Sequence, residues 1–183
     1  MLLVRGCVQP VMAPQIDAAA VRLLSRLGIT LVQARDAGCC GALHHHLTLP
    51  EGALERARRN VDAWWPLVES GVEAILVTAS GCGAMLREYG HLLRNDPQYA
   101  HRAERISSLA RDPVELLAVE APRLANQVPA GSPATRIAFH APCSLQHGLR
   151  ITGAVEGLLR SLGAELTVID DAHACCGSAG TYS

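Results

Sequence analysis

Hydrophobic positions along the chain alternate between short continuous runs and longer segments with helical spacing. The continuous runs predict five short strands, at 2–4, 29–32, 74–78, 136–139 and 166–169. Helical spacing predicts helices at 15–27, from Pro50 to a kink or end near Pro66, from about Ala84, over much of 98–125, and at 146–162. Strands that alternate with helices form parallel sheets through right-handed crossovers, so the pattern predicts an α/β fold.

The chain also repeats itself. Cys7 precedes the pair Cys39-Cys40 by 32 residues, Cys143 precedes the pair Cys175-Cys176 by the same spacing, and a glycine follows each pair. The segment "VRLLSRLGITLVQA" at 21–34 is similar to "EGLLRSLGAELTVID" at 156–170. We interpret this as an internal duplication with a period of 136 residues. It predicts duplicated Rossmann-like units with short parallel sheets and flanking helices: a first unit at 1–127, a linker at 128–135, and a truncated second unit at 136–183.

The cysteines of the first unit follow three predicted strands. Carboxyl ends of parallel strands share one edge of a sheet, so we expect the four thiols of Cys7, Cys39, Cys40 and Cys82 to converge there. We also expect Gly83 and Ala84 to begin a helix whose free N–H groups face a bound anion. In the second unit Cys143, Cys175 and Cys176 should converge in the same way.

Four soft thiolates select an iron–sulfur cluster or zinc. Buried packing, a disulfide framework and a cysteine nucleophile remain alternatives. The cysteine count of seven is odd and the N-terminus does not read as an export signal, which disfavours disulfides. No thiol is singled out beside a base, which disfavours a nucleophile.

Histidines accompany these motifs. Those expected nearest the thiols are His44, His45, His46, His140 and His173. They could donate hydrogen bonds to a cluster or to a quinone, or carry a proton; the competing interpretation is polar loop or helix-capping residues.

Composition and charge bear on whether the chain binds nucleic acid, crosses a membrane or holds a flavin. The chain has 183 residues, a net charge of −1 and 49% hydrophobic residues. This charge gives no support to a nucleic-acid partner, and no apolar run approaches the ~20 residues that a transmembrane helix needs. No glycine-rich dinucleotide turn is present either, so we expect no flavin in this chain.

The motifs "GCVQP" (6–10), "CCGALHHHL" (39–47), "ASGCGAM" (79–85), "HAPCSLQH" (140–147) and "CCGSAGTYS" (175–183) carry a family resemblance. The chain resembles the cysteine-rich CCG domain of heterodisulfide reductases and of 2-hydroxy-acid dehydrogenases, and most of all the glycolate oxidase iron–sulfur subunits. The resemblance implies an oxidoreductase subunit that relays electrons from a flavin subunit, which oxidises glycolate to glyoxylate, toward a quinone-type acceptor. It implies a cytoplasmic protein that could sit on the inner face of the membrane through its complex, with all seven cysteines as ligands and no catalytic residue of its own.

Two departures from the family pattern qualify these expectations. The subunits of this family begin with a two-cluster ferredoxin domain, which is missing here, and a partner for Cys82 in the second unit would fall near position 218. We therefore expect a fragment without glycolate-oxidising activity of its own. The turn around Cys82 supplies one thiol where heterodisulfide reductase has two, so four ligands favour an ordinary [4Fe–4S] cluster. Two alternatives stay open: a zinc-binding scaffold that docks the flavin subunits, and a thiol–disulfide oxidoreductase acting through Cys39 and Cys40.

Overall fold

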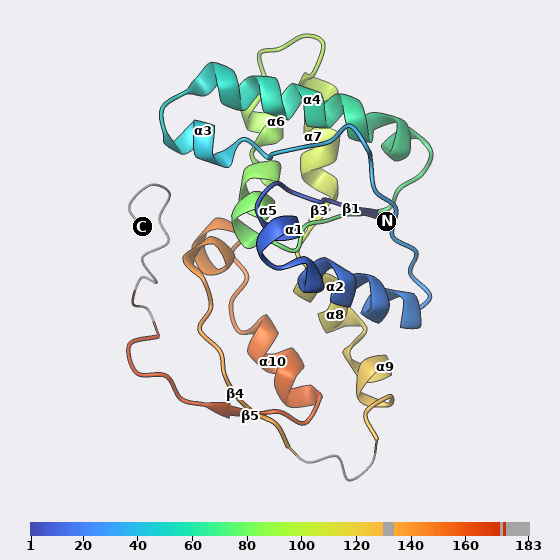
Figure 1. Cartoon of the computed structure of the whole chain (residues 1–183), viewed down its shortest axis with the longest axis vertical. Coiled ribbons are helices and arrows are strands. Elements are labelled where there is room, and N and C mark those ends of the chain that lie inside the picture. The colour runs from blue at the N-terminus through green and yellow to red at the C-terminus, as the bar shows by residue number, and fades with distance from the viewer. Residues whose placement is uncertain (130–133, 173, 175–183) are drawn as a thin grey trace.

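Three parallel strands form the sheet of the first unit, which lies near the middle of the molecule in Figure 1. The structure, a computed structural model, describes residues 1–129, 134–172 and 174. The strands are β1 (Leu2–Leu3), β2 (Ile75–Leu76) and β3 (Ala110–Arg111), in the order β1-β2-β3. Leu2 pairs with Ile75, and Ile75 pairs with Ala110. The predicted α/β fold is confirmed, and the central place of β2 agrees with its continuous apolar run. The Rossmann-like detail stays a prediction.

Nine helices surround this sheet in the described part of the first unit. They are α1 (Gln9–Met12), α2 (Pro14–Arg26), α3 (Ala42–His46), α4 (Pro50–Glu69), α5 (Ser80–Arg87), α6 (Tyr89–Leu92), α7 (Ala100–Leu109), α8 (Pro113–Val119) and α9 (Ala121–Ala125). Successive strand residues point to opposite faces of a sheet. Leu2 and Ile75 therefore pack into a core with α4, α5 and α7. Leu3 and Leu76 pack on the other face, against α2 and α9.

The strand predicted at 29–32 shrinks to a single bridge, between Val32 and Leu2. The Leu3 N–H donates to the Val32 carbonyl at 2.8 Å, and the Val32 N–H donates to the Met1 carbonyl at 3.0 Å. This segment lies at the edge of the sheet and is only half-buried, so few of its residues pair. The third full strand is instead β3, in the stretch where the sequence predicts only helix.

Two helix boundaries differ from the prediction. The helix α4 continues through Pro66 to Glu69. Pro66 lies on the exposed side of α4, so the carbonyl that loses its donor can bind water, while buried Trp64 holds the opposite side in the core. The helix α5 begins at Ser80 rather than near Ala84. Gly28 adopts φ +79° directly after α2, as its predicted role of stopping that helix requires.

The second unit has two parallel strands, β4 (Arg136–Ala138) and β5 (Glu165–Thr167), with Ile137 opposite Leu166. In both strands only the middle residue is partly buried. The single helix predicted at 146–162 is divided into a π-helical turn, η1 (Ser144–Gly148), and α10 (Ala154–Ser161). Arg150 and Gly153 lie between them with φ of +58° and +70°, a left-handed conformation that cannot continue a right-handed helix.

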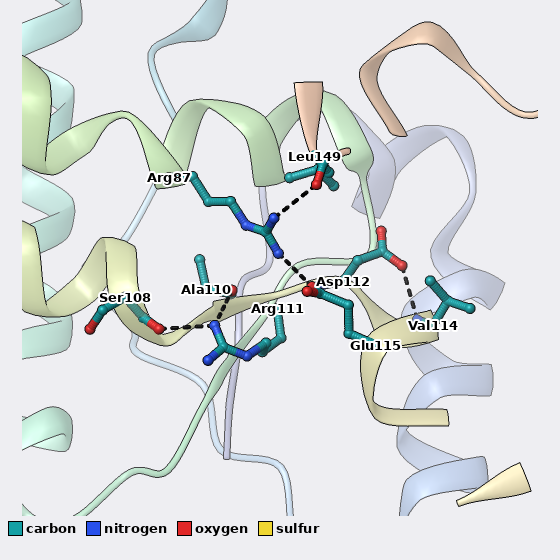
Figure 2. Close-up of polar contacts among 8 residues, drawn as sticks. All are labelled: Arg87, Ser108, Ala110, Arg111, Asp112, Val114, Glu115 and Leu149. Carbon is teal, nitrogen blue, oxygen red and sulfur yellow. Dashed lines mark hydrogen bonds and ion pairs between the residues drawn. The ribbon is translucent and has the colours of Figure 1, made fainter. Parts of the chain in front are cut away.

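A polar junction joins the two units (Figure 2). Arg87, the last residue of α5, donates to the carbonyl of Leu149 at 3.1 Å and forms an ion pair with Glu115 of α8. Glu115 also accepts from the Asp112 N–H, and Asp112 accepts from the Val114 N–H, which completes a capping box on α8. Apolar residues of α10 pack beside this junction. The predicted boundaries at 127 and 135 stay a prediction, and residues 130–133 of that linker lie outside the described residues.

No helix among the described residues is long and apolar enough to cross a membrane.

Candidate metal centre

The fold delivers the first four cysteines from three segments of the chain. Cys7 lies in the turn after β1, and Cys39 and Cys40 lie just before α3. Cys82 lies in the first turn of α5, which follows β2. Because β1 and β2 are parallel, the segments that follow them emerge at the same edge of the sheet.

The thiols meet in two contacts. The Cys40 Sγ lies 3.3 Å from the Cys82 Sγ, and the Cys7 thiol interacts with that of Cys39. The Gly41 N–H also donates to the Cys39 Sγ at 3.5 Å. The structure therefore brings these four side chains near one another in two pairs, while their convergence on one metal and their role as ligands stay predictions. Within the described residues, no three Cys, His, Asp or Glu side chains are already arranged around a single metal ion.

Contacts between the thiols shift their pKa values in opposite directions. The pKa of Cys40 is far above its ordinary value because its S–H donates to Cys82 and because the group is buried. The same hydrogen bond lowers the pKa of Cys82. Burial, followed by the neighbouring Cys39, raises the pKa of Cys7. Of the Cys40–Cys82 pair, Cys82 therefore ionises more readily, and metal binding would release the proton held by Cys40.

Two structural features favour glycine at position 41, the third residue of the first Cys-Cys-Gly motif. Its φ is +90°, and it caps the start of α3. A Cβ at this position would lie 3.1 Å from the Ala53 carbonyl oxygen of α4. The vicinal cysteines are therefore placed close against α4 by a turn that favours glycine.

A buried polar network lies beneath the Cys39-Cys40 pair. Asn60 of α4 accepts from the Gly38 N–H at 2.8 Å and donates to the Cys39 carbonyl at 3.0 Å. Tyr89, at the start of α6, donates to the Cys40 carbonyl at 2.8 Å. Sequence analysis missed both residues. The available signal was a polar Asn60 within the helical stripe that buries Ala53, Ala57, Val61 and Trp64.

A cavity of about 320 Å³ opens beside the thiols. Its wall includes Cys7 and Cys82 with the apolar side chains of Val4, Ile16 and Val77. Thr78, which also lines the cavity, donates to Asp17 at 2.7 Å. The donor set of four soft thiols, next to a cavity of this size, fits an iron–sulfur cluster.

The predicted helix N-terminus at Cys82 needs correction. The Gly83 N–H donates to the Ala79 carbonyl at 2.9 Å, so it is already part of the helix and not free to face an anion. The N–H groups without such a partner belong to the first turn, Ser80 to Cys82, because α5 begins four residues earlier than predicted. Cys82 itself thus lies within the first turn.

The histidines divide by exposure. His45, His46 and His140 are exposed. The His44 ring packs on Gly52, where a Cβ would lie 2.8 Å from the His44 Cδ2. The His44 Nδ1 is buried and has no hydrogen-bond partner among the residues that the structure describes. Whether any of them contacts a cofactor stays a prediction. His173 lies outside the described residues.

In the second unit Cys143 is exposed and precedes η1. Cys175 and Cys176, its predicted partners, lie outside the described residues. The Ser144 hydroxyl lies 2.7 Å from that of Ser80, which is two residues before Cys82. The cysteine-bearing turns of the two units therefore adjoin one another.

Comparison with known proteins identifies the family to which the cysteine-bearing segments belong. The model of the cysteine-rich domain family matches residues 1–87 and 137–183, both cysteine-bearing segments. The chain belongs to the cysteine-rich domain family. It is 51% identical over 182 residues to the glycolate oxidase iron-sulfur subunit of Escherichia coli (strain K12). The match covers all of this chain and 44% of that protein.

Two further members of this family are less similar. A probable glycolate oxidase iron-sulfur subunit of Bacillus subtilis (strain 168) is 32% identical, over 97% of the chain and 39% of that protein. Lactate utilization protein A of Geobacillus thermodenitrificans (strain NG80-2) is 30% identical, over 97% of the chain and 71% of that protein. The chain thus spans less than half the length of the two glycolate oxidase relatives.

Proposed function

We propose that this chain is an electron-transfer part of an iron–sulfur subunit in a 2-hydroxy-acid oxidase complex, with glycolate as the substrate of that complex. The observation that carries the proposal is the meeting of Cys7, Cys39, Cys40 and Cys82 at one edge of the first sheet. The identity to glycolate oxidase iron-sulfur subunits supports the choice of cofactor and complex.

In this proposal the four thiolates hold a [4Fe–4S] cluster, which supplies one-electron transfer when bound. The chain's own residues deliver the ligands: β1 and β2 set the edge, Gly41 lets the vicinal pair approach α4, and α5 presents Cys82. Cys143, Cys175 and Cys176 would belong to a second centre. The Ser80–Ser144 contact supports a short path between the two.

The partners follow from the same proposal. Electrons would come from a flavin-containing subunit that oxidises glycolate and would leave to a quinone-type acceptor, and a ferredoxin domain of the same subunit would share the relay. We place the complex in the cytoplasm, at the inner face of the membrane. Glycolate oxidation itself would belong to the flavin subunit, because the thiol site described here offers a redox relay and no hydride acceptor.

The test is a metal count on the full chain, purified without oxygen and reconstituted with iron and sulfide. We expect about four irons and four sulfides for the first centre, and an electron paramagnetic resonance signal after reduction. Zinc in place of iron would contradict electron transfer and favour a scaffold.

One observation favours a second candidate, a thiol–disulfide oxidoreductase. The Cys40 and Cys82 sulfurs are in contact, and the lowered pKa of Cys82 favours a reactive thiolate. Alkylation separates the candidates. Thiolates bound to a cluster are protected from the alkylating reagent until the metal is removed. A catalytic dithiol, once reduced, reacts with the reagent at once, whether or not the chain has been treated with metal.

A further inference from the structure

We propose that Asn60 and Tyr89 are positioning residues for the Cys39-Cys40 pair, whose backbone they hold so that its thiols meet those of Cys7 and Cys82. The inference rests on the proposed function, because it assigns these two residues a role in building that metal centre.

Asn60 and Tyr89 satisfy the backbone of three consecutive residues. Asn60 Oδ1 accepts from the Gly38 N–H, and its Nδ2 donates to the Cys39 carbonyl, while the Tyr89 hydroxyl donates to the Cys40 carbonyl. A fourth bond ties the two side chains together, since Asn60 Nδ2 also donates to the Tyr89 oxygen at 2.9 Å. The vicinal cysteines have no regular secondary structure of their own, so these side chains take the place of a strand partner.

The network is buried, so the loss of any of its hydrogen bonds would leave a polar group without water to replace the partner. Asn60 and Tyr89 are both 0% exposed, and Asn60 is the one polar or charged residue that is fully buried among those described. An apolar side chain would serve the packing of α4 equally well. A polar group persists at such a position when it satisfies buried backbone groups that would otherwise lack partners.

Both side chains are mounted on rigid elements. Asn60 lies in the middle of α4, and Tyr89 stacks on Trp64 of the same helix with ring centroids 6.3 Å apart and 14° between the planes. Hydrogen bonds from α4 and α6 therefore hold the Cys39-Cys40 backbone in place, although this segment is an irregular loop. Ligands held in this way keep their geometry when the metal is bound, and they tune its properties.

The test uses two variants of the full chain. Tyr89→Phe removes only the hydroxyl and keeps the stack on Trp64, while Asn60→Asp keeps an acceptor for the Gly38 N–H and loses both donors. Two variants serve as matched controls. Tyr99→Phe removes a tyrosine hydroxyl bond to Asp62 elsewhere, and Ile106→Val loosens the same core without touching the network.

Three measurements distinguish positioning from plain stabilisation. The first is the absorption spectrum of the Co²⁺-loaded chain, whose thiolate bands report ligand geometry. The second is the alkylation rate of Cys40 in the metal-free chain, read by peptide mass. The third is the iron and sulfide content with the line shape of the reduced cluster. We expect both test variants to change the Co²⁺ spectrum and the line shape. We expect them to speed Cys40 alkylation by about tenfold or more, because one lost buried hydrogen bond already has that effect and each variant loses two.

The outcomes separate the two proposals. Test variants that match the controls in spectrum and line shape, with iron content falling only in proportion to stability, would overturn the positioning role. If the unaltered chain takes up no iron–sulfur cluster, the proposed function fails. The Co²⁺ spectrum and the alkylation rates would then still decide whether Asn60 and Tyr89 position the thiols.

Discussion

The two units of this chain share a cysteine motif but differ in how their sheets are covered. In the first sheet both residues of β1 and of β2 are buried, with helices on both faces. In the second sheet the first and last residues of β4 and of β5 are exposed. Cys143, the counterpart of Cys7 in the repeat, is exposed as Cys7 is, and only the vicinal pair of the first unit reaches a buried position, at Cys40.

In the first unit the helices that cover the sheet also reach the cysteine motif. Spacing places thiols at the edge of a sheet, but the first unit also supplies a helix, α4, whose Asn60 reaches the backbone of the vicinal pair. Parallel strands require cover on both faces before their edge is a rigid platform. The contact between Ser144 and Ser80 gives the turn of Cys143 a neighbour in the better-covered first unit.

The largest expected effect separates the two cysteine sets. We expect Cys82→Ser to abolish the first centre, because it removes one of the four proposed ligands and breaks the contact with Cys40. Cys143→Ser, the matched control, should leave the spectrum of the first centre unchanged. Iron counting and electron paramagnetic resonance on both variants measure this. An unchanged first centre in Cys82→Ser would disprove the ligand assignment.

The next effect compares the two sheets directly. Ile75→Ala in β2 empties a fully buried position at the centre of the first sheet, and we expect it to lower the free energy of unfolding by about 4 kcal/mol. The same substitution in the middle of β4, Ile137→Ala, removes a half-buried side chain and should cost about 1 kcal/mol. Denaturant unfolding measures both. Equal losses would show that the second sheet is covered as fully as the first.

A third, smaller effect concerns the junction of Figure 2. Arg87→Leu should lower the free energy of unfolding by about 1.5 kcal/mol, because it breaks a partly buried ion pair with Glu115 and the bond to the Leu149 carbonyl. Arg123→Leu is the control, because Arg123 also forms an ion pair with a glutamate, Glu120, but its side chain is 60% exposed. It should change stability by about 0.5 kcal/mol or less.

Sequence reasoning predicted the features that depend on local pattern. The strands at 2–4 and 74–78, the helix at 15–27 with its stop at Gly28, and the meeting of four thiols all follow from apolar spacing and from the geometry of parallel strands. The strands and the helix follow from the spacing of apolar residues, the helix stop follows from one glycine, and the place of the thiols follows from their positions after parallel strands.

The features it missed depend on contacts distant in sequence. β3 is two residues long and becomes a strand only because β2 lies beside it. Helix α4 passes through Pro66 because Trp64 is held in the core. Asn60 reads as an ordinary helix residue until the Cys39 carbonyl, 21 positions away, is placed against it. Tertiary packing decides all three, and no local propensity contains that information.

The smallest predicted effect tests the cap that supports the junction. Asp112 accepts from the Val114 N–H at 2.9 Å, so Asp112→Ala should lower the free energy of unfolding by about 1 kcal/mol. Asp112→Asn keeps an acceptor and is the matched control. Burial raises the pKa of the Asp112 carboxyl above its ordinary 3.8, so its charged form costs stability in full once the pH exceeds the folded pKa, and that cost disappears below 3.8.

Asparagine avoids this cost. We therefore expect Asp112→Asn to equal or slightly exceed the unaltered chain in stability at pH 7 and to lose that advantage at pH 3. Unfolding curves at the two pH values measure the difference. A loss as large as that of Asp112→Ala at pH 7 would show that the charge at Asp112, through the nearby Arg87, stabilises the junction more than its burial costs.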